Sequence, residues 1–195
     1  FIVMAGALVL GLFFGSIAGY FGGKVDTIIM RMMDVFMSVP NLLMAMTLIV
    51  VFGQGIGSLW LAMALTNFPG IARTVRSSIM TVRSAEYVDA AHIYGASTWK
   101  ILGKHILPNC IGPVVISATL MLGSTILGIA GMGFLGIGIA PPTPEWGTIL
   151  SEVKDYIRFY PYLGIIPGTA IALSVIFINF MGDGLRDALD PRMKK

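Results

Sequence analysis

The sequence predicts an all-α protein, a polytopic membrane helix bundle, because it is too apolar for a soluble domain and its charges are clustered. Apolar residues make up 56% of the 195 residues, charged residues only 12%, and the mean hydropathy is +0.85. A soluble domain carries about 25% charged residues. A chain with this many apolar residues is not intrinsically disordered. Cys110 is its single cysteine, so the fold does not rest on disulfides within the chain.

Four long stretches without Asp, Glu, Lys or Arg hold the predicted spans, since a membrane helix needs about 20 mostly apolar residues. They are residues 1–23, 35–72, 105–144 and 159–182. The second stretch has room for two helices, and the turn residues from Gly53 to Ser58 divide it. We therefore expect five spans, near residues 1–23, 35–52, 58–76, 109–130 and 159–182.

The third stretch ends in a glycine-rich run that is too short for another crossing. Gly131, Gly133 and Gly136 match the spacing of a dinucleotide-binding loop. Such a loop follows a strand and opens a helix, whereas this run follows an apolar helix and leads into Pro141 and Pro142. We expect a broken turn here rather than a nucleotide site.

The basic residues predict the orientation. Five spans place residues 20–34, 73–108 and 183–195 on one side, with 11 of the 13 Lys and Arg residues. Only Lys154 and Arg158 remain on the other side. Cytoplasmic loops carry the excess of Lys and Arg, so we expect 73–108 and the C-terminus to be cytoplasmic and 139–160 external. The net charge of +3 is thereby explained by membrane topology, without nucleic acid.

Five spans place the first residue outside, within an apolar helix. We therefore expect the chain to be a fragment whose earlier, N-terminal part is missing.

Glycines recur every four residues in the first predicted span, at Gly11, Gly15 and Gly19. Gly164 and Gly168 repeat the spacing in the last span. Stripes of this kind let another backbone approach closely. We expect them to pack within the bundle, with packing on a second subunit as the alternative.

Polar side chains within the spans have two possible roles. They either line a pathway or form hydrogen bonds between helices, and the sequence leaves both open. The candidates for lining a pathway are Asn41, Thr47, Asn67, Ser124 and Asn179.

Catalytic and metal-binding patterns are not found in the sequence. His92 and His105 have no Cys or carboxylate at ligand spacing, so we expect no metal site. We expect no cofactor either, because no phosphate loop or nucleophile–His–acid set occurs. Ionisable residues are absent from the middle of the spans, which disfavours a proton-coupled carrier.

Residues 77–108 form the most informative segment, a long polar loop with a helical pattern. Its first helix carries Glu86 near the start, and Gly95 is expected to end it in the left-handed conformation. Ser97 is placed to begin a second helix. One face of the first helix combines small and aromatic residues, namely Tyr87, Ala90, Ala91 and Tyr94.

The same loop carries a spaced motif, Asp89-Ala90-Ala91, three residues, Gly95, nine residues, and His105-x-Leu107-Pro108. It resembles the signature loop of the permease subunits of binding-protein-dependent ABC importers. That pattern is Glu-Ala-Ala, three residues, Gly, nine residues, Ile, one residue, Leu-Pro. The spacing agrees in full, with an Asp for the Glu and a His for the Ile.

Other segments are similar to the dipeptide, oligopeptide and nickel branch of this family. The external Pro-Pro-Thr-Pro-Glu-Trp-Gly loop at 141–147 resembles its "C"-type permease. The remaining segments are 18–23, 68–73, 86–88, 105–109 and 182–192.

The resemblance implies a division of labour. This chain is then a non-catalytic subunit that forms the pathway with a second permease in the cytoplasmic (inner) membrane of a prokaryote, surrounded by lipid. Two cytoplasmic ATPase subunits bind ATP and Mg, and an extracytoplasmic binding protein delivers the substrate. The whole subunit has six spans. The ATPase-coupling residues are then Glu86, Asp89, Ala90, Ala91, Gly95, Ala96 and Ser97.

Peptides are the expected cargo, and nickel, glutathione or another small solute are the alternatives. A stand-alone secondary transporter or channel is the main rival of another class. A membrane-embedded enzyme or a structural anchor accounts less well for the signature loop.

Overall fold

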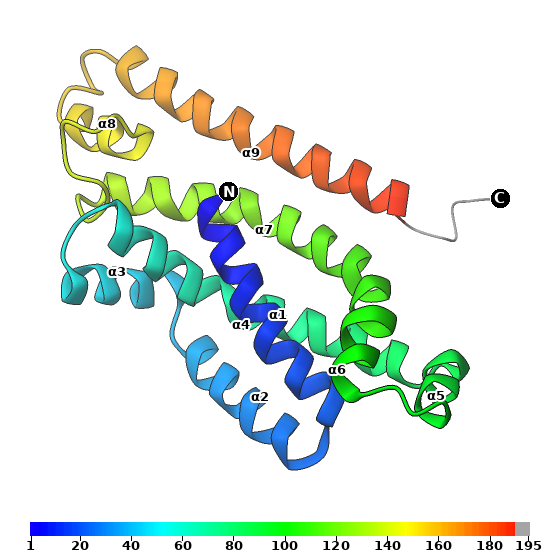
Figure 1. Ribbon diagram of the computed structural model, residues 1–195. Coiled ribbons are helices and arrows are strands. Elements are labelled where there is room, and N and C mark those ends of the chain that lie inside the picture. Colours follow the sequence, from blue (N-terminus) through cyan, green and yellow to red (C-terminus); the bar gives the residue numbers. More distant parts are fainter. Residues whose placement is uncertain (190–195) are drawn as a thin grey trace.

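A computed structural model describes residues 1–189 of the chain, and these residues contain helices without strands (Figure 1). The all-α prediction is thereby confirmed. Arg192, Lys194 and Lys195, which contribute to the predicted orientation, lie outside the described residues. The helices are α1 (Ile2–Phe21), α2 (Gly23–Ser38), α3 (Asn41–Phe52), α4 (Ile56–Arg83), α5 (Glu86–Ile93), α6 (Thr98–Lys100), the π-helical turn η1 (Ile101–Ile106), α7 (Leu107–Phe134), α8 (Trp146–Val153) and α9 (Tyr162–Leu189).

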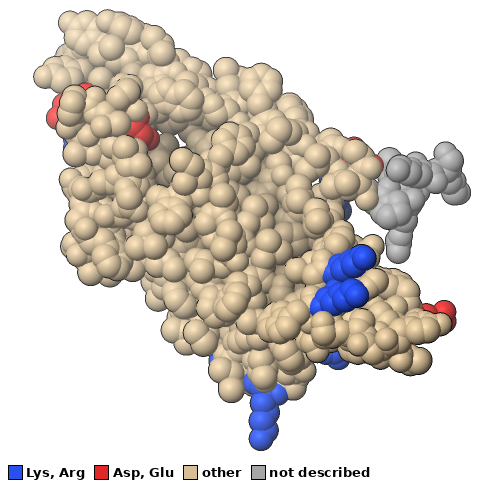
Figure 2. Space-filling model, in the orientation of Figure 1, with Lys and Arg blue, Asp and Glu red and all other residues tan. Residues whose placement is uncertain are grey.

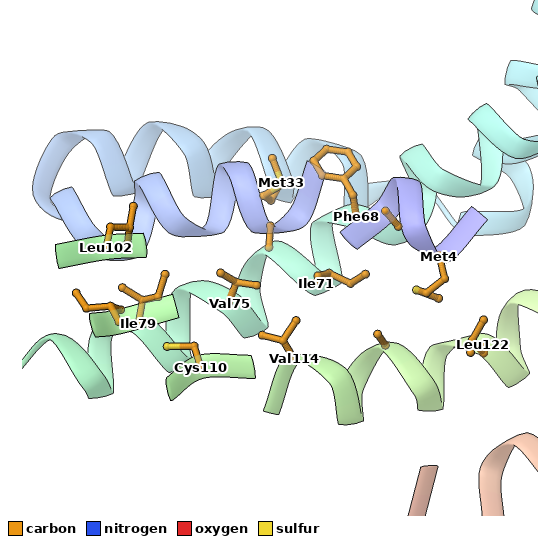
Figure 3. Close-up of a cluster of buried hydrophobic side chains, with 14 of the residues drawn as sticks. Met4, Met33, Phe68, Ile71, Val75, Ile79, Leu102, Cys110, Val114 and Leu122 are labelled. Atoms are coloured by element: carbon orange, nitrogen blue, oxygen red, sulfur yellow. The ribbon is translucent and has the colours of Figure 1, made fainter. Parts of the chain in front are cut away.

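Helix α4 is the centre of the bundle. It packs against α1 along most of its length, against α3 near its start, and against α7 (Figure 1). Helix α9 packs on α7, with α8 between them at one end. A core cluster joins α1, α2, α4, η1 and α7 through side chains such as Met4, Met33, Val75, Leu102 and Val114 (Figure 3).

The glycine stripe of α1 lies directly against α4. A Cβ added to Gly11 would be 2.5 Å from Cγ2 of Ile71, and one added to Gly19 would be 2.9 Å from Cβ of Ile79. The two backbones are therefore close enough that only glycine fits at these positions of α1. In α9, Gly164 approaches the Ile157 side chain, whereas Gly168 has open space around it.

The predicted helix at 35–52 is wrong as one continuous element. The chain breaks at Val39 and Pro40, and the axes of α2 and α3 differ by 87°. Proline disfavours helical geometry in the residue before it, and Val39 is extended, with φ −98° and ψ 132°. Helix α3 has 12 residues, too few to cross a membrane by itself.

Three helical segments are long and apolar enough to cross a membrane, namely α1, the continuous run Thr98–Phe134 and α9. The bent pair α2 and α3 passes the same test together. Helix α4 is not among them, although it has 28 residues. Polar residues such as Asn67 and Arg73 lower its hydropathy. By length and composition the described residues thus support three or up to four spans, and the predicted five stays a prediction.

The two ends of the bundle differ in charge. Helix α5 and the α1–α2 turn lie at one end, and α8 with the α3–α4 connection lies at the other (Figure 1). At the first end, Arg83 of α4 connects to α1 by donating a hydrogen bond from Nη1 to the carbonyl of Tyr20 at 2.6 Å. Basic side chains gather over this end, where acidic ones are seen as well, and further acidic ones are seen near α8 (Figure 2).

Candidate functional site

Helix α5 forms an exposed element that projects at the basic end of the bundle. It follows α4 after only two residues, and Glu86 and Asp89 lie in its first turn. Carboxylates at this position favour the helix through its dipole. Both side chains are exposed, so they are available to a partner.

Gly95 ends α5 in the predicted left-handed conformation, with φ 74°. The amide of Ala96 donates to the carbonyl of Ala91 at 3.1 Å, and the amide of Gly95 donates to that of His92 at 3.0 Å. This pair of bonds is a complete Schellman motif. Ser97 follows at the N-cap position of α6, but its side chain makes no capping hydrogen bond.

The small residues of α5 face the protein's own bundle. Val88 is fully buried, and Ala91 and Ala96 pack against the core cluster, while Ala90 is half-buried. These contacts hold α5 firmly on the bundle. They also mean that the alanine face is not the surface that α5 presents outward.

The outward surface of α5 is formed by its last residues. Ile93 is 85% exposed and Tyr94 is 90% exposed, directly before the Gly95 turn. Sequence analysis placed Tyr94 in the pattern but did not single out Ile93. The sequence did contain a sign that Ile93 is exposed. It is a large aliphatic residue next to a glycine turn in a polar loop, where no hydrophobic core is expected to bury it.

Two contacts connect this loop to neighbouring helices. The hydroxyl of Tyr20, at the end of α1, lies 3.5 Å from Nε2 of His92. The hydroxyl of Tyr87 lies 3.5 Å from the carbonyl of His105, in η1. Within residues 1–189 no cluster of three His, Cys, Asp or Glu side chains could hold a metal.

A pocket of about 390 Å³, mostly apolar but with five polar side chains in its wall, opens between α3, α4 and α7. It brings together three of the five residues considered for a pathway, namely Asn41, Asn67 and Ser124. Thr66 and Thr125, two further polar residues of the predicted spans, line it too. Which polar span residues share one pocket depends on how the three helices face each other, and one sequence does not show this.

Hydrogen bonds in the pocket run within single helices. Asn67 donates from Nδ2 to the carbonyl of Met63 at 2.7 Å, and Ser124 donates to that of Met121 at 2.9 Å. Neither is a bond between helices, which was the alternative role. These polar side chains therefore face the pocket without joining its three helices to one another.

The other two candidates lie elsewhere. Thr47 is exposed on α3 and donates to the carbonyl of Leu43 at 2.9 Å. Asn179 of α9 packs closely on Gly123 of α7, where an added Cβ would lie 2.8 Å from its Oδ1. The structure gives Thr47 and Asn179 no part in the pocket.

At the opposite end, α8 is fixed tightly to α7. Glu145 caps α8 by accepting hydrogen bonds from the amides of Gly147 at 2.9 Å and Thr148 at 2.8 Å. A side chain on Gly147 would overlap the backbone of Ala130, and one on Gly133 would overlap Glu145. The sequence analysis did not identify this cap, although Glu145 directly precedes a helix-compatible run. Residues 131–134, expected as part of a broken turn, continue α7, and the break comes at Gly136 with φ 76°.

Three helical segments long and apolar enough to cross a membrane, with an exposed glycine-terminated helix at one end of the bundle, are the architecture of an integral membrane protein. The chain belongs to the family of binding-protein-dependent transport system inner membrane components, which matches residues 11–195.

Curated relatives agree with this family. The di/tripeptide transport system permease protein DppC of Pseudomonas aeruginosa is 42% identical over 96% of the chain and 62% of its own length. The glutathione transport system permease protein GsiD of Pectobacterium atrosepticum is 38% identical over 100% of the chain and 64% of its own length. The chain spans less than two thirds of the length of these relatives.

A solved structure has the same fold. It is titled as an inward-facing conformation of the MetNI methionine ABC transporter, and its matching chain has a TM-score of 0.78 at 21% identity. The similarity covers 97% of this chain and 90% of that one.

Proposed function

We propose that this chain is a permease subunit that carries peptides across the cytoplasmic membrane of a prokaryote, together with a second permease. One observation carries the proposal: α5 is connected on both sides to helices that line the pocket containing Asn41, Asn67 and Ser124. Helix α4 reaches it directly, and α7 reaches it through α6 and η1. A displacement of α5 would thus move two walls of the pocket.

The coupling would run through α5. Two cytoplasmic ATPase subunits, which bind ATP and Mg, would close on the exposed Ile93 and Tyr94, with Glu86 and Asp89 available to pair with basic groups. The Schellman turn at Gly95 holds this surface in place. Helix α4 has 28 residues and, at 1.5 Å per residue, is about 42 Å long, so it can act as a lever between α5 and Asn67.

Peptides are the cargo that most of the relatives' names favour, since these include di/tripeptide, dipeptide and oligopeptide transport. An external binding protein would deliver the peptide from the α8 end. Residues 73–108 and the C-terminus would be cytoplasmic. Glutathione, which one relative is named for, nickel or another small solute is the alternative cargo.

Uptake in cells tests the cargo. A strain that lacks the full-length gene, and its complemented counterpart, should be compared for uptake of a labelled dipeptide, labelled glutathione and nickel. We expect complementation to restore vanadate-sensitive uptake of a peptide. Restored uptake of nickel alone or of glutathione alone would contradict the peptide proposal, and vanadate-insensitive uptake would favour a secondary transporter.

The pocket predicts a separate effect on transport. Asn67→Leu conserves approximate volume but removes the amide from the pocket wall. We expect peptide uptake by the assembled transporter to fall several-fold while the ATPase subunits still co-purify. Thr47→Val, on the exposed side of α3, is the matched control and should leave uptake unchanged. Equal uptake by both variants would exclude the pocket from the pathway.

The orientation predicts which residues react from outside. In a background with Cys110→Ala, an impermeant maleimide should label Glu152→Cys in intact cells. It should label Glu86→Cys only after permeabilisation, because α5 is at the basic end of the bundle. Labelling of the residue 86 variant from outside would reverse the orientation and remove the ATPase-docking role of α5.

A further inference from the structure

A long apolar groove on the bundle is not used by the proposed function. It consists of two adjoining pockets, of about 260 and 340 Å³, that share Leu12 of α1 and Leu107 of α7. The first pocket reaches Ser16 and Trp99, and the second continues past Ile111. On α1 the groove extends from Leu8 to Ile17, about 14 Å at 1.5 Å per residue.

The π-helical turn leaves the groove open at one end. Residues Ile101–Ile106 interrupt the otherwise α-helical run from α6 into α7, and such π-helical turns are frequent at functional sites. Gly103 lies within this turn and lines the groove. Nothing lies within 4 Å of where its Cβ would be, so this side of the groove has room for an occupant.

A buried hydroxyl in the groove has no partner. Ser16 is 6% exposed, and its Oγ is the buried side-chain polar atom in residues 1–189 that lacks a hydrogen bond. It lies five residues before the end of α1, about 7–8 Å below that end. An occupant with an acceptor oxygen at this depth would satisfy the hydroxyl.

Positive charge borders the open end. Lys100 and Lys104 are exposed and flank Gly103, and within residues 1–189 neither forms a salt bridge. Figure 2 shows basic side chains over this part of the molecule. Trp99 is 67% exposed at the same end, and tryptophan favours the membrane–water interface.

We propose that this groove is a binding site for one anionic phospholipid of the cytoplasmic leaflet. An acyl chain would lie along Leu12, Leu107 and Ile111, an ester carbonyl would accept from Ser16, and the phosphate would lie between Lys100 and Lys104. The order of these groups along the groove, apolar, then a hydroxyl, then two cations, matches the order of groups in such a lipid. The proposal rests on the orientation given under the proposed function, which makes this end cytoplasmic.

Photocrosslinking tests the site in the assembled transporter. The complex should be reconstituted with a phosphatidylglycerol that carries a diazirine in one acyl chain, or with a phosphatidylcholine that has the same chain. Mass spectrometry of the labelled peptides then locates the lipid. We expect phosphatidylglycerol to label the α1 and α7 segments of the groove several-fold more than phosphatidylcholine does.

Two variants separate the headgroup site from the acyl-chain site. Lys100→Gln with Lys104→Gln should reduce labelling by phosphatidylglycerol several-fold, to the level of phosphatidylcholine, because the two lysines attract the anionic headgroup. Gly103→Leu should reduce labelling by both lipids, because its side chain enters the open side of the groove. Lys154→Gln with Arg158→Gln removes two cations at the other end and should change nothing.

Equal labelling by the two lipids would overturn the proposal, and so would a loss in the Lys154 and Arg158 control. An unlabelled groove would show that a polypeptide segment covers it, which also overturns the proposal. The readout needs neither peptide uptake nor ATP hydrolysis. The lipid-site proposal would therefore remain valid if the peptide proposal were wrong, and the peptide proposal would remain valid if the lipid site were absent.

Discussion

Gly15→Val is expected to prevent assembly of a stable bundle. A Cβ at this position would lie 2.5 Å from the carbonyl oxygen of Ala72 and 2.7 Å from Cβ of Val75. The first of these atoms belongs to the backbone of α4 and cannot rotate away. Overpacking of this kind costs about 1–3 kcal/mol even where neighbours can adjust. We expect a lower melting temperature and a several-fold lower yield of the purified complex.

Gly131→Val is the matched control, because Gly131 lies in the apolar helix α7, is not followed by a proline, and has nothing within 4 Å of its Cβ position. It should leave yield and melting temperature unchanged. Equal loss in both variants would mean that valine itself, rather than the α1–α4 contact, is the cause. Gly168→Val adds a further comparison. A lower yield or melting temperature for Gly168→Val would show that the open side of α9 contacts a second subunit.

Gly95→Val is expected to uncouple transport while leaving the bundle in the membrane. Gly95 has φ 74°, and a left-handed conformation costs an L-residue about 1–2 kcal/mol. If the turn is lost, the Ala96–Ala91 hydrogen bond is lost and Ile93 and Tyr94 shift. The same free energy corresponds to about five- to thirtyfold in a docking equilibrium. We expect ATP-driven uptake, and the amount of ATPase that co-purifies, to fall by such a factor.

Gly95→Asn separates the turn from its glycine. Asparagine tolerates the left-handed conformation better than other non-glycine residues, so this variant should retain most of the uptake. The amount of protein in the membrane should be equal for both variants, since Gly95 is outside the predicted spans. Unchanged uptake with valine would mean that the geometry of this turn does not control docking.

The turn at Gly95 was predictable because its cause is local. A glycine that follows eight helical residues is the usual way to end a helix, and the φ angle agrees. The spacing of Gly11, Gly15 and Gly19 likewise predicts a close helix contact. It does not name the partner, because Ile71, Val75 and the rest of the α4 surface select it only in three dimensions.

The end of a helix at the α2–α3 bend was not predicted, for a different reason. A run without charges from 35 to 52 resembles one span, and hydropathy does not respond to backbone geometry. Pro40 contained the relevant information, since the residue before a proline avoids the helical region. Only some of the pocket residues could be predicted, for a similar reason. Thr47 and Asn41 are both polar residues of α3, but which of them faces the pocket depends on where α4 packs.

The low apolarity of α4 has a consequence for biogenesis. This helix contributes many of the buried residues of the core, yet it is not among the helices apolar enough to enter lipid unaided. If α4 is a span, as the sequence predicts, its place in the membrane would depend on protein contacts, chiefly with the surface of α1. Because α1 precedes α4 in the chain, that surface would already be in the bilayer when α4 leaves the translocon. The N-to-C order of the two helices would then also be their order of insertion.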